Sequence, residues 1–394
     1  MRPFEGIKVV DATHVLAGPF ASYQLALLGA DVIKVEDPDE PDHTRTQGHE
    51  KDVRDARMGS GFLTQSSNKR SITLDLKQES AREAFKRLVA QADILVENYR
   101  PGAFEAIGLG YKDLSALNPR LIYCSMSAFG QTGPKRTRTA YDQVIQATSG
   151  LMAQTGTEEV SPIKMGAPVV DYATGLSGAF AMASALFQRE RTGRGQRIDL
   201  AMLDVAMILM SSHLTSYFLS GHVPQPTQKF PISTGGTYRC KDGAMVMIAA
   251  SNPRQVKRFW MALGREDFAN ETYDERLQNR DRQAQFISEL FLTKTAAEWE
   301  EFFQSRHVPA GRVRNMDEAL ADPQIASRGV LHEHQPCDGV GRPFRVPVSP
   351  FMFEHGGPRV DTPPPRFGAH TDAVLADLGF SAADIAAMRG TRAI

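Results

Sequence analysis

Residues 7–36 decide the fold, and they read IKVVDATHVLAGPFASYQLALLGADVIKVE. The branched apolar run Ile7 to Asp11 predicts a strand, and Asp31 to Glu36 predicts a second one. Between them, Pro19 to Leu28 has the length and residue types of a helix, which Gly29 closes. Two apolar strands joined by a helix indicate a βαβ unit, because parallel strands need a crossover connection.

The same alternation of strands and helices continues toward the middle of the chain. We expect strands at Ser71–Asp75, Asp93–Val96 and Leu121–Met126, with an amphipathic helix at Glu79–Gln91. This order predicts an α/β fold whose large domain is Rossmann-like, with a doubly wound parallel sheet. The first strand is followed by Ala17-Gly-Pro19 and not by GxGxxG, so no nucleotide redox cofactor is expected.

A linker rich in proline and glycine, Gly221–Gly236, separates two regions of the chain. We expect a large domain made of residues 1–215 and 330–394, and a smaller α/β domain at residues 225–325. The helix predicted at Gly175–Glu190 is crowded with small residues, which favours close packing. The apolar run Met202–Leu219 predicts either a buried helix or an oligomer contact.

The composition is that of an ordinary globular chain of 394 residues, 42% of them hydrophobic and 23% charged. The 45 lysines and arginines are balanced by 46 acidic residues, and the net charge of −1 disfavours a nucleic-acid partner. Neither a leader peptide nor a long apolar run is evident, so we expect no membrane partner. Three widely spaced cysteines disfavour a disulfide framework and predict a cytoplasmic protein.

No metal site is expected. His332 and His334 flank Glu333, which fits an edge strand with both histidines facing solvent better than a metal-binding pair. Cys124 lies inside the apolar run Leu121–Met126 and is expected in the core, not as a nucleophile.

The segment GAPVVDYATG, residues 166–175, carries the sharpest chemical signal. An extended apolar stretch delivers Asp171 just before a helix rich in small residues. One interpretation is that Asp171 caps this helix. The other is a carboxylate nucleophile, held ionised beside backbone N–H groups that stabilise the oxyanion of an acyl transfer.

Short motifs over nearly the whole chain resemble, in the same order, those of the class III CoA-transferases. This is the CaiB/BaiF family of formyl-CoA transferase, carnitine CoA-transferase and α-methylacyl-CoA racemase. The motifs are Ala17-Gly-Pro19, LGADVIKVE (28–36), NKRSITLDLK (68–77), ENYRPG (97–102), FGQTGP (129–134), GAPVVD (166–171), TGRGQ (192–196), VPAG (308–311), DP (322–323) and GAHTD (368–372). The resemblance implies the family III fold and an interlocked homodimer.

The resemblance implies an acyl-CoA:carboxylate CoA-transferase in which Asp171 matches the nucleophile of the family. Its carboxylate would form an aspartyl anhydride and then an aspartyl-CoA thioester. In the racemase branch a histidine precedes the aspartate that here is Asp142. This chain has Tyr141 there, and a phenol is a poor general base near neutral pH, so transfer is favoured. An acyl-CoA racemase or isomerase and a non-catalytic CoA-binding protein remain alternatives.

The resemblance also implies which residues contact CoA, which is a substrate here and not a resident cofactor. The implied CoA-binding residues are Leu16, Ala17, Leu74, Asp75, Leu76, Lys77, Asn98, Tyr99, Arg100, Arg138, Thr139, Ala140 and Tyr141. Asp142, Gly235 and Gly236 are expected to position the substrate, although a capping or solvated role for Asp142 is equally open.

Several positions depart from the family pattern. Asp37 and Ala106 stand where some members have arginines, and Thr139 stands where some have a lysine. Leu16 replaces a glutamine of the formyl-CoA and oxalate enzymes, and their long glycine-rich loop is reduced to Gly235-Gly236. We therefore do not expect formyl-CoA or oxalate specificity.

Overall fold

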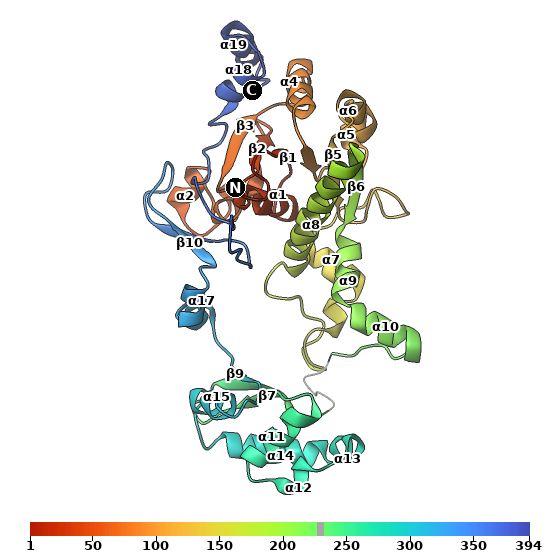
Figure 1. Cartoon of the computed structure of the whole chain (residues 1–394), viewed down its shortest axis with the longest axis vertical. Coiled ribbons are helices and arrows are strands. Elements are labelled where there is room, and N and C mark those ends of the chain that lie inside the picture. The colour runs from red at the N-terminus through yellow and green to blue at the C-terminus, as the bar shows by residue number, and fades with distance from the viewer. Residues whose placement is uncertain (227–231) are drawn as a thin grey trace. The chain divides into compact units, whose positions relative to one another are not determined.

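The computed structural model describes residues 1–226 and 232–394, which form two compact units (Figure 1). Unit 1 comprises residues 1–151, 164–222 and 329–394, and unit 2 comprises residues 152–163 and 223–328. Residues 152–163 belong to unit 2 in the structure, whereas the sequence-based boundaries assign them to the large domain. Each unit has a sheet and a hydrophobic core of its own.

Unit 1 contains a six-stranded sheet whose order, β3-β2-β1-β4-β5-β6, is that of a doubly wound Rossmann fold. All five neighbouring pairs are parallel. The strands are β1 (Lys8–Ala12), β2 (Asp31–Glu36), β3 (Lys69–Thr73), β4 (Ile94–Glu97), β5 (Ile122–Ser127) and β6 (Gln196–Ala201). The predicted α/β class is confirmed, and five of these strands lie within two residues of their predicted positions. Strand β6 was not predicted.

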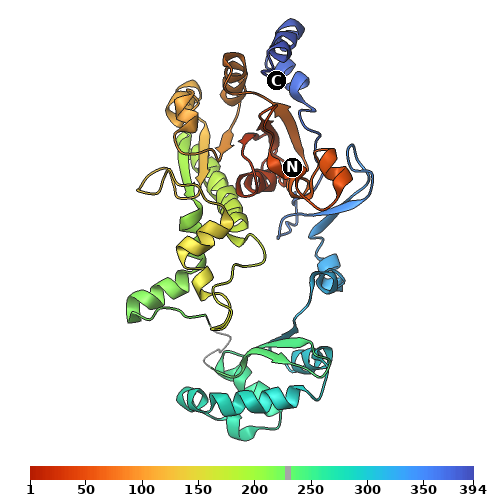
Figure 2. The same ribbon diagram turned by 180° about the vertical axis from the view of Figure 1, so that it is seen from behind.

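The alternation of side chains along each strand divides the core into two layers. In β1, Val9 belongs to the layer shared with α1 (Ala17–Leu27) and α8 (Val169–Thr192). Its neighbour Val10 belongs to the opposite layer, with α4 (Glu79–Ala90). Figure 2 shows the same sheet from behind. Burial on both faces explains the consecutive apolar residues at Val9-Val10, Val32-Ile33 and Ile94–Val96.

Short elements complete unit 1, and unit 2 is built on an antiparallel sheet. The remaining elements of unit 1 are η1 (His43–Thr46), α2 (Lys51–Asp55), α3 (Ser60–Leu63), α5 (Ala103–Ala106), α6 (Tyr111–Leu117), α7 (Asp142–Ser149), α9 (Met202–Leu209), α10 (Ser211–Ser220), β10 (Leu331–His334), β11 (Phe344–Pro347), α18 (Thr371–Asp377) and α19 (Ala382–Gly390). Those of unit 2 are η2 (Met152–Gln154), β7 (Gly235–Arg239), β8 (Met245–Ala249), β9 (Ala310–Arg312), α11 (Pro253–Ala262), α12 (Glu266–Ala269), α13 (Tyr273–Gln278), α14 (Arg280–Phe291), α15 (Ala296–Gln304), α16 (Met316–Leu320) and α17 (Pro323–Ser327).

The apolar run Met202–Leu219 is not one buried helix. It divides into α9 and α10, which meet at an angle of 70°. No residue of α10 is buried, so the prediction of a buried helix is wrong for this half. Helix α8 is long and apolar enough to cross a membrane, as is the bent pair. However, α8 packs against α1, β5 and β6 as a core helix does.

His332 and His334 form part of strand β10, as expected, but neither side chain is exposed, and His332 is half-buried. His334 is buried, and its Nε2 lies 2.9 Å from Ser67 Oγ. The prediction that both histidines face solvent is therefore wrong. Cys124 is fully buried, as predicted. Among the described residues no group of three metal-ligating side chains occurs.

Helices α1 and α8 approach closely because of a glycine in α8. A Cβ atom added to Gly175 would lie 2.9 Å from the backbone oxygen of Ala17 and 2.8 Å from a ring carbon of Phe20. A backbone atom cannot move out of the way as a side-chain end can. Gly175 lies one turn after Asp171 in the same helix, so this contact also fixes the distance of Asp171 from the start of α1.

Replacing Gly175 by alanine is expected to push α1 and α8 apart and to lower the free energy of unfolding by about 1–3 kcal/mol. Urea unfolding followed by circular dichroism measures this change. Gly390→Ala is the matched control, since Gly390 is also helical and has open space around its Cβ position. A Gly175→Ala variant as stable as the control would contradict the close approach.

Candidate active site

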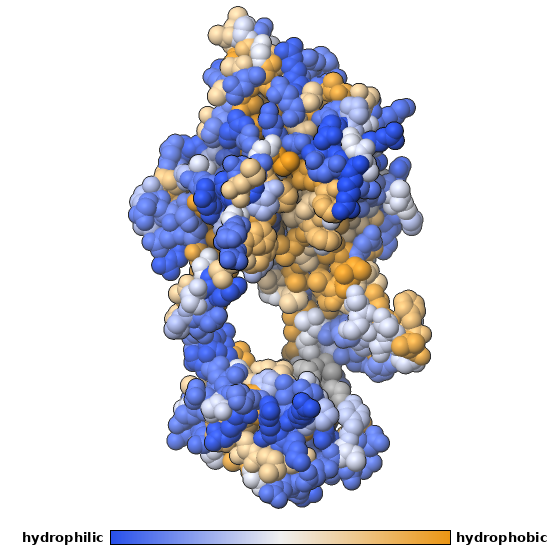
Figure 3. Space-filling model, viewed as in Figure 1, coloured by the Kyte–Doolittle hydropathy of each residue, from blue (hydrophilic) through white to orange (hydrophobic). Residues whose placement is uncertain are grey.

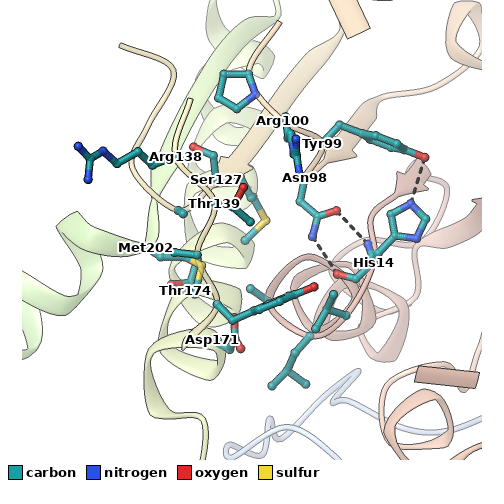
Figure 4. A pocket seen from close by; sticks show the side chains of 18 residues that line it. His14, Asn98, Tyr99, Arg100, Ser127, Arg138, Thr139, Asp171, Thr174 and Met202 are labelled. Atoms are coloured by element: carbon teal, nitrogen blue, oxygen red, sulfur yellow. Dashed lines mark hydrogen bonds between the residues drawn. The ribbon is translucent and has the colours of Figure 1, made fainter. Parts of the chain in front are cut away.

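A cavity of about 280 Å³ lies at the carboxyl ends of β1, β4 and β5, and Figure 4 shows it. Strands β1 and β4 are neighbours whose connections run to opposite sides of the sheet, and ligands bind at such a switch point in α/β folds. Its lining residues are His14, Val15, Leu16, Ala17, Asn98, Tyr99, Arg100, Pro101, Met126, Ser127, Ala128, Arg138, Thr139, Ala140, Tyr141, Asp171, Thr174 and Met202.

The loops after β1 and β4 are joined by hydrogen bonds from one side chain (Figure 4). The amide of Asn98 accepts from the backbone N–H of His14 at 2.9 Å and donates to the His14 carbonyl at 2.8 Å. The imidazole Nε2 of His14 lies 3.0 Å from the hydroxyl of Tyr99. Burial lowers the pKa of His14. These contacts fix the wall of the cavity on the β1 and β4 side.

Two exposed arginines, Arg100 and Arg138, line the same cavity. Neither guanidinium forms an ion pair with any residue in the described part of the chain. Their charges are therefore available to an anionic ligand. The hydroxyl of Thr174 is buried and also has no partner among the described residues, so it can bind a ligand that fills the cavity.

Asp171 lies in the first turn of α8, and a second carboxylate holds the backbone beside it. One oxygen of Asp142 accepts from the backbone N–H of Val170 at 2.8 Å and from that of Asp171 at 3.1 Å. The cap interpretation of Asp171 is wrong, because Pro168 is the capping residue of α8. Asp142 is buried and satisfies the N–H groups that an aspartate cap would have bound, so the solvated alternative for Asp142 is wrong as well.

The electrostatic surroundings of Asp171 favour its neutral form. Its side chain is 9% exposed and has no hydrogen bond or ion pair with a described residue. Burial, and then the negative charge of Asp142, raise the pKa of Asp171 to about 7. The expectation that free N–H groups of its own helix hold this carboxylate ionised is wrong, because Asp142 already occupies those of Val170 and Asp171. A carboxyl that can gain or lose a proton near neutral pH is typical of a reactive group.

A second cavity, of about 460 Å³, adjoins Asp171. It shares Val15, Leu16, Tyr141 and Asp171 with the first. The rest of its lining contains hydrogen-bonding side chains and no lysine or arginine: His43, Thr44, Gln47, Gly61, Asp142, Gln143 and Pro168. Asp171 therefore stands in the lining of two cavities with different chemistry, one bordered by arginines and the other by neutral polar groups, a histidine and Asp142.

Nine of the thirteen sequence-predicted CoA-binding residues line the first cavity, and four do not: Leu74, Asp75, Leu76 and Lys77. These four residues follow the carboxyl end of β3, and β2 lies between β3 and β1 in the sheet. The Leu74 side chain is buried in the core. Lys77 forms an ion pair with Asp37, which raises the pKa of Lys77. Their role in CoA binding stays a prediction.

Several residues that line the cavities were not predicted from the sequence, and the predicted pair Gly235 and Gly236 lies in unit 2. His14, Thr174, Met202 and His43 were not singled out, because nothing in their local sequence marks them. Gly235 and Gly236 lie in β7 of unit 2, where they pair with Ala249 and Ile248. Their role in positioning substrate stays a prediction.

This fold and site agree with the comparison to known proteins. Residues 4–371 match CoA-transferase family III, and the chain belongs to this family. It is similar to human succinyl-CoA:glutarate CoA-transferase, with 34% identity over 96% of this chain and 86% of the human protein. It is also similar to succinate–glutarate CoA-transferase of Agrobacterium fabrum (strain C58 / ATCC 33970), with 35% identity over 95% of this chain and 96% of that protein.

A solved structure gives the same result. The crystal structure of a CaiB/BaiF family protein from Brucella suis has a TM-score of 0.82 and 34% identity, covering 96% of this chain and 99% of that chain. The protein is thus a family III CoA-transferase, and its substrates are CoA thioesters and carboxylic acids. The resemblance to this family is confirmed.

Asp171→Asn is expected to stabilise the fold in a pH-dependent way. The carboxyl has a pKa of about 7 in the folded protein and an ordinary value of 3.8, so the folded state binds this proton more tightly. Ionisation of Asp171 thus removes stability as the pH rises from about 4 to about 7. At pH 8 the variant should exceed the wild type by about 2–4 kcal/mol, and the difference should shrink toward pH 5.

Urea unfolding at pH 5 and pH 8 measures the difference. Asp204→Asn is the matched control, because Asp204 is an exposed aspartate in the first turn of α9. A gain at Asp171 that does not grow with pH, or an equal gain in the control, would contradict the raised pKa.

Proposed function

We propose that this chain moves CoA between an acyl-CoA and a carboxylic acid with Asp171 as the nucleophile. The single observation that carries the proposal is the position of Asp171 in the lining of both cavities. A group that must receive an acyl unit from CoA and return a different one needs access to both partners. Asp171 has that access and is otherwise unpaired among the described residues.

The proposed reaction conserves the energy of the thioester. A carboxylate oxygen of Asp171 attacks the thioester carbonyl carbon, the carbon–sulfur bond breaks, and CoA leaves as the thiolate. The thiolate then attacks the aspartyl carbonyl carbon of the mixed anhydride and releases the donor acid as its carboxylate. The acceptor acid repeats these steps in reverse order. No water is consumed, and the cavities must exclude water because an anhydride hydrolyses.

CoA fits the first cavity by its chemistry. Arg100 and Arg138 offer unpaired positive charges for its phosphates, and Tyr99 offers an aromatic face for its adenine. Thr174 places a free hydroxyl one turn beyond Asp171, in reach of the part of the ligand near the thioester. The first cavity therefore supplies the anion and aromatic contacts that a phosphorylated adenosine and its arm require.

We assign the acid to the second cavity, whose wall has neutral polar side chains together with His43 and Asp142. His43, Gln47 and Gln143 can donate hydrogen bonds to oxygen atoms, whereas an aliphatic chain would leave them unpaired. These donors favour a short polar acid, and a second carboxylate would accept their hydrogen bonds without a lysine or arginine in this lining. The relatives named for succinate and glutarate transfer support the same class of acid.

The test combines trapping of the intermediate with a substrate panel. After addition of succinyl-CoA, hydroxylamine or borohydride should label Asp171, located by mass spectrometry of peptides. Asp171→Ala and Asp171→Asn should lower turnover of succinyl-CoA with glutarate by at least about 1,000-fold, because no other group forms the anhydride. Asp204→Asn is again the control and should keep its activity.

A panel of succinate, glutarate, malate, acetate and butyrate as acceptors should show faster transfer to the dicarboxylates. Retained turnover in Asp171→Ala, or a label on another residue, would overturn the catalytic role. Loss of the α-proton into D₂O without any acceptor acid would indicate a racemase instead.

We also propose that the protein is a cytoplasmic homodimer. The outer surfaces of α8, α9 and α10 expose large apolar side chains, and Figure 3 shows them as a hydrophobic surface along these helices. The exposed fractions are 76% for Phe180, 61% for Phe187, 72% for Ile208, 81% for Phe218 and 84% for Leu219. A contiguous apolar surface of this kind is typical of an oligomer contact. Three unpaired cysteines support a reducing compartment.

Light scattering coupled to gel filtration tests the dimer. Phe180→Glu combined with Phe218→Glu should convert the wild-type dimer to a monomer, because burying a carboxylate in an apolar contact is costly. Leu117→Glu is the matched control: Leu117 is 48% exposed on α6, which packs with the opposite core layer. A monomeric wild type, or dissociation caused equally by the control, would contradict the proposed contact.

A further inference from the structure

The loop 15–17, which borders both cavities, is supported by buried charged side chains. Lys34 Nζ lies 3.1 Å from a carboxylate oxygen of Asp42, and both side chains are 1% exposed. The same ammonium donates to the carbonyl of Thr13 at 2.7 Å. A second buried pair joins Arg45 to Glu36 at 2.6 Å, next to Asp42 along the chain. Removing one partner of such a buried ion pair would leave an uncompensated charge, which strongly destabilises a fold.

Val15 has an unusual backbone conformation at the centre of this loop. Its φ angle is 73°, in the left-handed region that a β-branched residue avoids. Two side chains hold it there. The carboxylate of Asp42 accepts from the Val15 N–H at 3.2 Å, and the amide of Gln65 donates to the Val15 carbonyl at 2.7 Å. Without these bonds the chain would relax toward an ordinary conformation.

The loop 15–17 matters for the site because it borders both the cavity proposed for CoA and the cavity proposed for the acid. Val15 and Leu16 line the two cavities together with Asp171, and Ala17 begins α1 where it meets Gly175. A change of conformation at Val15 would therefore move the wall shared by the CoA cavity and the acid cavity. Arg100 and Arg138 lie in other loops, after β4 and before α7.

We propose that Asp42 and Gln65 are positioning residues that hold Val15 in its left-handed conformation and thereby set the loop 15–17 against Asp171. The inference rests on the proposed catalytic role of Asp171. Neither residue touches the reacting atoms. They act through the backbone of Val15, and the strain at Val15 persists because both ends of that residue are bonded to buried side chains.

The two positioning residues are held by different means. Burial by itself would raise the pKa of Asp42, but Lys34, His14 and the hydrogen bonds from Thr44 outweigh it and lower the pKa to about 2. Gln65 is 1% exposed and uncharged, and its Oε1 has no partner in the part of the chain that the structure describes. The amide of Gln65 thus makes its one described hydrogen bond to Val15.

Gln65 is the better residue to change, since Asp42→Asn would remove the ion-pair partner of the buried Lys34 and endanger folding. Gln65→Met keeps the volume and removes only the donor to Val15. With the most active donor and acceptor of the panel, kcat should fall by about 10- to 100-fold, because the loop beside Asp171 shifts. KM for the acyl-CoA should rise by a smaller factor than kcat falls, since Arg100 and Arg138 still bind the phosphates on the proposed assignment.

Val15→Gly supplies the rescue, because glycine adopts a positive φ angle without strain. In the Val15→Gly background, Gln65→Met should lower kcat by less than about threefold, so the two substitutions are strongly coupled. A structural role of Gln65 alone would give the same loss in both backgrounds. Equal losses, or a loss that appears in KM and not in kcat, would overturn the proposal.

Gln24→Met is the matched control. Gln24 is 3% exposed on α1 and makes its hydrogen bond to Ser349, so the variant also loses one buried bond. It should be destabilised without the fall in kcat. Hydrogen exchange gives a second readout that needs no substrate: amides of residues 14–18 should exchange faster in Gln65→Met than in wild type or control.

Unchanged exchange in this segment would overturn the proposal. If instead Asp171→Ala retains turnover, the catalytic role fails on its own, and the exchange and coupling results still decide whether Gln65 holds Val15.

Discussion

The site depends on a carboxylate that the fold buries without compensating its charge. Asp171 is 9% exposed, has no counter-ion among the described residues and stands beside the negative Asp142. Ionising such a group costs free energy, so other parts of unit 1 must hold it in place. Asp142 does so through the backbone of α8, and Gly175 does so by allowing α1 to come close. The burial that raises the pKa of Asp171 therefore also lowers the free energy of unfolding when this carboxyl is ionised.

Elsewhere in unit 1 the opposite solution is found. Lys69 and Asp11 are both fully buried, yet their charged groups lie 2.9 Å apart, and Ser22 binds each of them. This cluster sits under the first turn of α1, whose Pro19 carbonyl also accepts from Lys69. The charges of Lys69 and Asp11 thus compensate each other, whereas the charge of Asp171 has no ion-pair partner among the described residues. Glu97 and Asp142 are also buried without an ion pair among the described residues, but both accept hydrogen bonds, whereas the Asp171 side chain has neither.

Much of this architecture can be read from the sequence, because buried parallel strands have few alternatives. The strands through Val9, Val32 and Ile94 are apolar on both faces and were placed correctly. Strand β6 was missed because Gln196 to Ala201 alternates polar and apolar residues at the edge of the sheet, and it follows a turn that reads as a boundary. The break between α9 and α10 was missed because both halves are equally apolar.

The site was predictable to the extent that its residues follow strands. Asn98 and Tyr99 come directly after β4, and Leu16 follows β1 by a few residues, so the topology alone brings them together. The state of Asp171 was not predictable, since it depends on which side chain fills the N–H groups of α8. That side chain, Asp142, is 29 residues away along the chain. Local sequence carries no record of such a contact.

The division of the lining into two sets has an evolutionary consequence. Arg100 and Arg138 border only the first cavity, whereas His43, Gln47 and Gln143 border only the second. On the proposed assignment of ligands, substitutions in the second set can alter which acid is accepted while the grip on CoA stays intact. Related enzymes with this fold can then evolve different acid specificities through the second cavity, while the residues that bind CoA stay the same.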